Sequence, residues 1–226
     1  MSERKWFEDL FDDLESQKNS ERAAYMHAYM KNQFEFLGVS TPARKAICKK
    51  YLKEAATEKK VDFNFVGICY ESRYREHQYV AVNYLDAVAD YLKESDLPKV
   101  KNCIITKSWW DTIDGLDRIV GRMAAEYPAI NKTLLAWSTD ENIWLRRVAI
   151  DHQLDRKTKT NTELLEKIIV NNLNQKEFFI NKAIGWSLRE YSKTNPDWVA
   201  DFIKRHKNGL AALSLREAAK YLPGNK

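Results

Sequence analysis

The chain contains little glycine and proline, the residues on which tight turns depend. Seven Gly and five Pro among 226 residues are too few for the turns of an all-β fold of this size. The motifs G-x-x-x-x-G-K-[ST], G-x-G-x-x-G and G-x-S-x-G are also missing. We therefore expect neither an all-β fold, nor nucleotide hydrolysis, nor serine-hydrolase chemistry.

Cysteine and histidine are scarce and scattered. Cys48, Cys69 and Cys103 are odd in number and have no C-x-x-C spacing. The four histidines do not form an H-E-x-x-H motif or another metal-ligand spacing. The sequence thus predicts buried, reduced thiols, no metal and no cofactor.

Long apolar runs are absent as well. No uncharged run approaches the roughly 18 residues of a membrane span, and the first five residues lead into charges instead of an apolar segment. We expect no signal peptide, no membrane association and a cytoplasmic location. The net charge of +5 permits a polyanionic partner but does not require one.

Apolar residues recur at helical spacing along nearly the whole chain. Breaks between the amphipathic segments predict about a dozen helices and no strand. No linker rich in Gly, Pro or Ser divides them, so we expect one continuous domain over residues 1–226. Four helix starts carry capping signals: Thr41 before Pro42, Asn195 before Pro196, Ser108 with Asp111, and Asn174 with Glu177.

Short stretches of the chain repeat at a spacing of 34 residues. They begin at Val80, Asp114, Val148 and Lys182, each inside an amphipathic segment. A fixed period of this length is typical of stacked helix pairs. The prediction is an all-α, curved solenoid of HEAT-like antiparallel helix pairs, whose concave surface is lined by one helix of each pair.

The second copy of the repeat contains a candidate site. Trp110 and Asp114 lie four residues apart and share one face of the predicted helix. The alternative is that Trp110 belongs to the core and Asp114 is a solvated carboxylate. Trp109 directly before the pair, Trp186 two repeats later and Arg147 one repeat later favour a functional site.

Basic residues are concentrated in the central and C-terminal repeats. About half of them are expected to be ordinary solvated side chains, but Arg147 and Arg189 on the repeated helices would suit phosphates. Tyr29 and Lys45 belong to a second polar and basic group near the N-terminus.

Long, unusual motifs make the chain similar to one known family. They include Lys107–Asp114, Asn142–Arg147 and Glu177–Tyr191, with shorter matches from Tyr29–Asn32 to Leu213–Ala218. With these motifs the sequence resembles the bacterial AlkD-type DNA alkylation repair enzymes, which are DNA glycosylases built from HEAT-like repeats. The resemblance extends over nearly the whole chain.

The resemblance implies an armadillo-type helical fold and hydrolysis of the N-glycosidic bond of N3- and N7-alkylated purines. It places the catalytic residues at Trp110, Asp114 and Trp186, and DNA-backbone contacts at Arg147, Tyr29 and Arg189. Lys45 stands where the family usually has arginine, so it keeps the charge but loses the forked geometry. The implied partner is duplex DNA with alkylated purines, bound by a monomer without a dedicated base-flipping pocket.

The residues themselves are compatible with this chemistry. An N3- or N7-alkylated purine is cationic, so it leaves as a neutral base and needs no general acid. Asp114 could stabilise the positive charge that develops on the sugar, and the indole rings of Trp110 and Trp186 could add cation–π contacts. A non-catalytic scaffold that binds damaged DNA or a protein partner is the alternative, and release of free base distinguishes the two.

Overall fold

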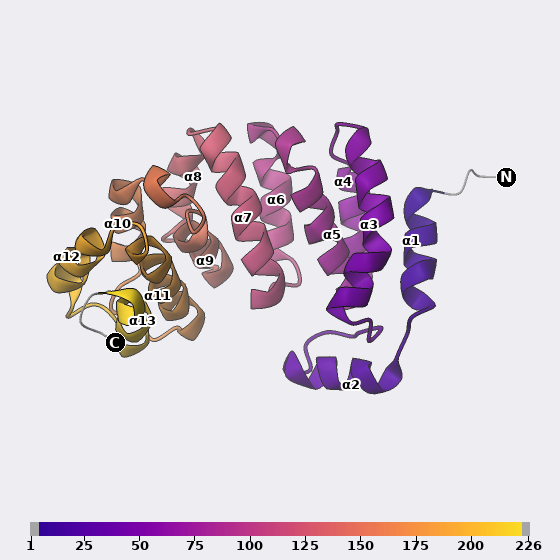
Figure 1. Cartoon of the computed structure of the whole chain (residues 1–226), viewed down its shortest axis with the longest axis horizontal. Coiled ribbons are helices and arrows are strands. Elements are labelled where there is room, and N and C mark those ends of the chain that lie inside the picture. The colour runs from indigo at the N-terminus through magenta and orange to yellow at the C-terminus, as the bar shows by residue number, and fades with distance from the viewer. Residues whose placement is uncertain (1–4, 223–226) are drawn as a thin grey trace. The chain divides into compact units, whose positions relative to one another are not determined.

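The chain is organised in helices. A computed structural model describes residues 5–222 and divides into two compact units, one ending at Leu92 and one beginning at Lys93. Thirteen α-helices and four short 3₁₀ turns are present in this described part, where the only β-type pairing is an isolated bridge between Glu35 and Tyr74. None of the described helices is both long and apolar enough to cross a bilayer. The predicted all-α class is confirmed (Figure 1).

The first unit packs its helices around α3 and α5. Helix α1 packs on α3, and α3 and α4 both pack on α5. On α5 the buried residues Val80, Ala81, Tyr84 and Leu85 follow helical spacing, which gives this helix a continuous apolar face. The helices of this unit are α1 (Trp6–Glu15), α2 (Ser20–Tyr29), α3 (Thr41–Thr57), α4 (Phe63–Glu71) and α5 (Arg75–Ala87), with a 3₁₀ turn at Ala89–Tyr91.

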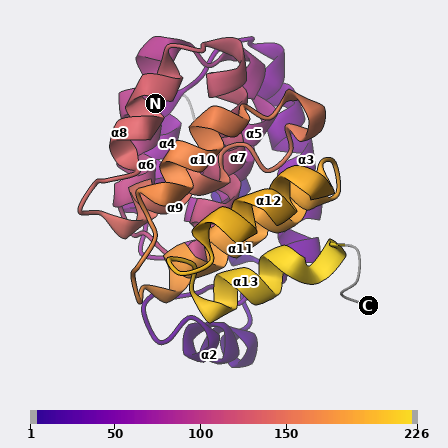
Figure 2. The same cartoon turned by 90° about the vertical axis from the view of Figure 1, so that its left-hand side faces the viewer.

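The second unit is a stack of helix pairs. Helix α7 packs on α9, α9 on α11, and α11 on α13, while α8 and α10 form the neighbouring row. Figure 2 shows the end of this stack, with α10, α11, α12 and α13 facing the viewer. Its α-helices are α6 (Leu97–Ile105), α7 (Trp110–Glu126), α8 (Ile130–Trp137), α9 (Ile143–Asp151), α10 (Thr162–Val170), α11 (Phe178–Ser192), α12 (Pro196–His206) and α13 (Ala212–Ala218).

The 34-residue period corresponds to equivalent places in four helices. Val80 lies in α5, Asp114 in α7, Val148 in α9 and Lys182 in α11, each in the second turn of its helix. The period therefore follows one helix of each pair, and stacked helix pairs are confirmed.

Two of the predicted helix starts are close to the structure. Asn195 is the N-cap of α12 and accepts a hydrogen bond from the Trp198 amide, as predicted. Helix α3 begins one residue earlier than expected. Its N-cap is Ser40, whose hydroxyl accepts from the Ala43 amide, so Thr41 is the first helical residue.

The other two predicted caps are wrong. Helix α7 begins at Trp110 and α11 at Phe178, so Ser108 and Asn174 both lie outside the cap position. The Ser108 hydroxyl donates instead to the Ile104 carbonyl at the end of the preceding helix. Asn174 has a φ of 58° and donates its amide to the Gly209 carbonyl. Both side chains belong to the connection between helices, where the spacing rule does not apply.

A buried carboxylate fixes the corner before α3. Glu76 on α5 is fully buried and accepts the backbone amides of Leu37, Gly38 and Val39 at 2.9–3.1 Å. Gly38 has a φ of 85°, and a Cβ atom there would come within 2.0 Å of the Asn19 carbonyl oxygen. This corner therefore requires glycine at position 38.

We predict that Gly38→Ala lowers the free energy of unfolding by at least about 2 kcal/mol, because a left-handed backbone and a clash with backbone both oppose the methyl group. Gly67→Ala is the matched control, since a Cβ at that exposed site in α4 has no neighbour within 4 Å. It should stabilise by roughly 0.5–1 kcal/mol through helix propensity. Urea unfolding measures both, and equal effects of the two variants would contradict the role of Gly38.

Candidate functional site

Helices α7, α9 and α11 meet at the side chain of Arg147. Its Nη2 and Nε donate to Oδ1 of Asp114 at 2.8 and 3.1 Å, and its Nη1 donates to the Phe179 carbonyl at 2.8 Å. The Arg147 side chain is only 2% exposed. A buried guanidinium with these bonds is held in one orientation, and it holds Asp114 in turn.

Asp114 keeps one oxygen available. Both hydrogen bonds from Arg147 end on Oδ1, and within the described chain Oδ2 has no hydrogen-bond partner. The side chain is 25% exposed. Burial raises the pKa of Asp114, while the charge of Arg147 and its hydrogen bonds lower it. The Asp114 carboxyl group is therefore held in place through Oδ1, and its Oδ2 is directed away from Arg147.

Two further acids lie beside this pair and are wholly buried. Asp117 follows Asp114 by nearly one turn of α7, and Asp151 follows Arg147 by one turn of α9. Oδ2 of Asp151 lies 3.7 Å from Arg147 Nη2, and neither oxygen of Asp151 has a hydrogen-bond partner. Burial raises the pKa of Asp151 to about 7; for Asp117, burial and then the charge of Asp151 raise the pKa well above its ordinary value. Three acids therefore surround one guanidinium.

Trp186 on α11 is surrounded by cations. The guanidinium carbons of Arg147 and Arg189 lie 5.5 and 5.7 Å from its ring centroid, and Lys182 Nζ lies at 5.6 Å. Cation–π contacts at these distances are attractive. Arg147 thus links Asp114 on α7 with Trp186 on α11, two residues that the sequence placed in one site.

Glu217 on α13 neutralises two of these cations. It accepts from Lys182 Nζ and from Arg189 Nη1, each at 2.7 Å. The approach of α13 depends on Gly185, where a Cβ would come within 2.6 Å of the Glu217 Cβ. Arg189 is therefore paired with an acid of its own chain.

An aromatic cluster supports the Phe179 carbonyl. The rings of Trp109, Trp144 and Phe179 contact one another, with centroids 4.9–5.7 Å apart. Trp144 is buried and belongs to the core. Trp110 is half-buried at the first residue of α7, one turn before Asp114. Of the tryptophans near the site, Trp110 and Trp186 thus remain the candidates for contact with a ligand.

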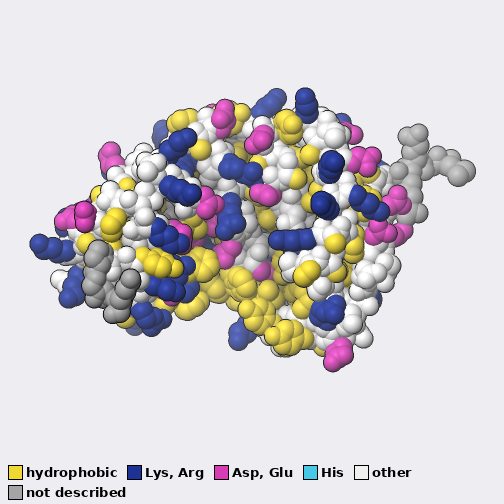
Figure 3. Space-filling view, viewed as in Figure 1, with side chains coloured by type: hydrophobic (Ala, Val, Ile, Leu, Met, Phe, Trp, Pro, Cys, Tyr) yellow, Lys and Arg dark blue, Asp and Glu magenta, His cyan; other side chains and the backbone are white. Residues whose placement is uncertain are grey.

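The remaining predicted residues belong to the first unit. Tyr29 ends α2 and is 59% exposed, and its ring stacks with that of Tyr25, with centroids 6.4 Å apart. Lys45 is exposed on α3. Figure 3 shows Lys and Arg side chains interspersed with acidic ones over the visible surface of both units.

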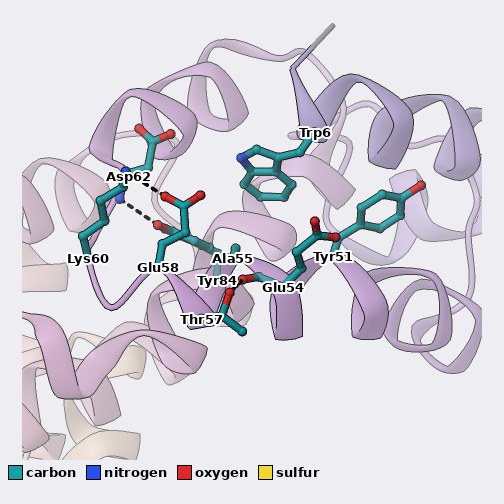
Figure 4. Close-up of a pocket in the computed structure, with 9 residues that line it drawn as sticks. All are labelled: Trp6, Tyr51, Glu54, Ala55, Thr57, Glu58, Lys60, Asp62 and Tyr84. Carbon is teal, nitrogen blue, oxygen red and sulfur yellow. Dashed lines mark hydrogen bonds and ion pairs between the residues drawn. The ribbon is translucent and has the colours of Figure 1, made fainter.

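A hollow in the first unit contains none of the predicted residues. It measures about 360 Å³. Figure 4 shows Trp6 above it, with Glu58, Lys60 and Tyr84 on the other side. Lys60 pairs with Glu58 at 2.7 Å, and the Tyr84 hydroxyl accepts from the Asp62 amide. Its polar lining is therefore largely paired within the protein.

Sequence reasoning missed three acids of the site. Asp117 and Asp151 stand at helical spacing from Asp114 and Arg147, a signal that could have indicated a shared face. Glu217 gave no such signal, because its partners lie 28 and 35 residues away. No group of three or more metal-ligating side chains that could hold an ion occurs in residues 5–222.

Comparisons with known proteins identify the family of the chain. The sequence model of the DNA alkylation repair enzyme family matches residues 10–222, so the chain belongs to this family. A solved structure from Enterococcus faecalis, described as a predicted DNA alkylation repair enzyme, is 41% identical. It covers 92% of this chain and 98% of its own, with a TM-score of 0.83. No curated protein sequence matches the chain.

We predict that Asp117→Asn raises the free energy of unfolding by about 1–2 kcal/mol at pH 8, because it removes a buried acid. The folded-state pKa of Asp117 lies above the unfolded value of about 3.9. The wild-type acid is therefore costly at high pH and is protonated as the pH falls, so the gain should shrink from pH 8 to pH 5.

Urea unfolding at both pH values tests this prediction. Asp155→Asn is the control, since that carboxylate is 78% exposed. It should change stability by less than about 0.5 kcal/mol at either pH. A gain for Asp117→Asn that is the same at pH 8 and pH 5 would show that its charge is not the cause.

Proposed function

We propose that the protein is a DNA glycosylase that hydrolyses the N-glycosidic bond of cationic N3- and N7-alkylated purines in duplex DNA. The family membership supports a role in DNA alkylation repair. The observation that carries the proposal is the fixed Asp114 carboxylate, which has one free oxygen and lies on the same guanidinium as Trp186.

The geometry suits a reaction without a general acid. The alkylated base departs neutral, so the main demand is stabilisation of the positive charge that develops on the deoxyribose. Oδ2 of Asp114 can face that charge and orient the attacking water, because Arg147 fixes the carboxylate through Oδ1. The faces of Trp110 and Trp186 would contribute about 0.5–2 kcal/mol for each cation–π contact.

Arg147 and Arg189 are both paired before DNA binds. Arg147 is buried against Asp114, and Arg189 is bonded to Glu217. The phosphate contact of Arg147 stays a prediction for the DNA-bound protein, and in the free chain this residue positions Asp114. Arg189 can reach a phosphate by exchanging one anion for another. Tyr29 and Lys45 are exposed, which leaves both accessible to a DNA backbone.

We predict that Asp114→Asn slows release of 7-methylguanine from a methylated duplex at least 100-fold, because loss of a preorganised charge costs about 3 kcal/mol or more at such sites. Duplex affinity should change less than about threefold. Single-turnover base release and fluorescence anisotropy measure the two quantities. Glu126→Gln, at the exposed C-terminal end of the same helix, is the control. Wild-type release by Asp114→Asn would remove this carboxylate from the mechanism, whereas binding without release by the wild type would indicate a non-catalytic DNA-binding protein.

We also predict that Glu217→Gln tightens binding to undamaged duplex by roughly 3- to 10-fold at 0.1 M salt, because it frees Lys182 and Arg189 for phosphates. Glu163→Gln is the control, since it breaks an exposed pair with Lys167 on α10. Titrations at two salt concentrations test the prediction. Equal affinities for the two variants would place Lys182 and Arg189 away from the DNA.

A further inference from the structure

Asp151 is the least explained charged group of the second unit. Its side chain has no exposed surface, and both carboxyl oxygens lack a hydrogen bond. Buried polar groups are rarely left in this state, because desolvation is then uncompensated. The proposed chemistry assigns no task to this residue.

The position of Asp151 beside Arg147 suggests a role for it. Its Oδ2 lies 3.7 Å from Arg147 Nη2, which is about 0.5–1 Å longer than a hydrogen bond. The same Nη2 bonds Asp114 at 2.8 Å. Arg147 therefore has two carboxylates within reach of one nitrogen, one of them engaged and the other vacant.

The engaged partner is the one that the reaction needs. While Asp114 is bonded through Nη2 and Nε, much of its charge is offset by the guanidinium. More of its charge becomes available to the sugar when the Nη2 bond loosens while the Nε bond keeps the carboxylate in place. A buried guanidinium cannot lose its partner without a replacement, and water has little access to a side chain that is 2% exposed.

Resting on the proposed glycosylase function, we propose that Asp151 is a positioning residue that accepts Nη2 of Arg147 when the nucleotide binds, while Nε continues to hold Asp114. The bond from Nη1 to the Phe179 carbonyl serves as the pivot during this exchange. The guanidinium remains paired throughout, and Asp114 gains charge at the moment of substrate binding.

A neighbouring acid limits how many ionised groups this site contains. Asp117 is buried beside the group, and its Oδ1 has no hydrogen-bond partner. Three carboxylates and one guanidinium cannot all be ionised in a dry site. Burial and the charge of Asp151 raise the pKa of Asp117 well above its ordinary value, so Asp117 is the acid that holds a proton. Asp151 is then free to pair with Arg147 as an anion, and the exchange needs no proton transfer.

The first test compares Asp151→Asn with Asp117→Asn, two variants that each remove one buried acid. Asp151→Asn should slow single-turnover release of 7-methylguanine at least tenfold, with duplex affinity within about twofold and a melting temperature equal to or above that of the wild type. Asp117→Asn should remain within about threefold in release. A purely structural Asp151 would lower melting temperature together with rate, and that result would overturn the proposal. Equal slowing by both variants, or wild-type release by Asp151→Asn, would overturn it too.

The second test does not depend on base release. The Nε–H signal of Arg147 in a ¹⁵N-labelled protein, assigned with Arg147→Lys, should move when undamaged duplex is added to the wild type. The movement should be lost in Asp151→Asn, because the neutral amide is a much weaker acceptor for the guanidinium than a carboxylate. A signal that moves equally in both proteins, or in neither, would overturn the proposal. A wild type that shows the shift but releases no base would contradict only the proposed chemistry.

Discussion

The buried guanidinium of Arg147 is the group on which the second unit depends. A charge with almost no access to water must have its donors satisfied by protein, and here the acceptors come from two neighbouring helices. The Asp114 carboxylate on α7 and the Phe179 carbonyl on α11 are both fixed by one side chain on α9. The stacking of these helices and the direction of the candidate catalytic oxygen are consequences of the same set of bonds.

The packing around this group explains why the repeated helices carry so many polar and aromatic residues. An aromatic cluster covers the start of α9 and α11 and limits the access of water to the guanidinium. It consists of Trp109, Trp144 and Phe179. On the other side, Trp186 faces three cations, two of which are balanced by Glu217. The unit therefore concentrates unlike charges in a small volume, where they act more strongly than at an open surface.

Periodic features of the fold could be predicted from the sequence, while irregular ones could not. The 34-residue period identified the helices that carry Asp114, Arg147 and Trp186, because stacked pairs repeat their apolar faces. The caps at Ser108 and Asn174 were wrong, because the path of the chain between two helices decides where the next helix begins. Glu217 escaped notice for a related reason. Its partners lie on another helix, which helical spacing alone does not reveal.

The carboxylate of Glu76 has a consequence for the order of events during synthesis. It holds three amides of the corner before α3, yet it comes 37–39 residues later in the chain. The corner and the attached α2 can reach their final position only after α5 has left the ribosome and formed its first turn. Until then the three amides lack this acceptor, and water must satisfy them.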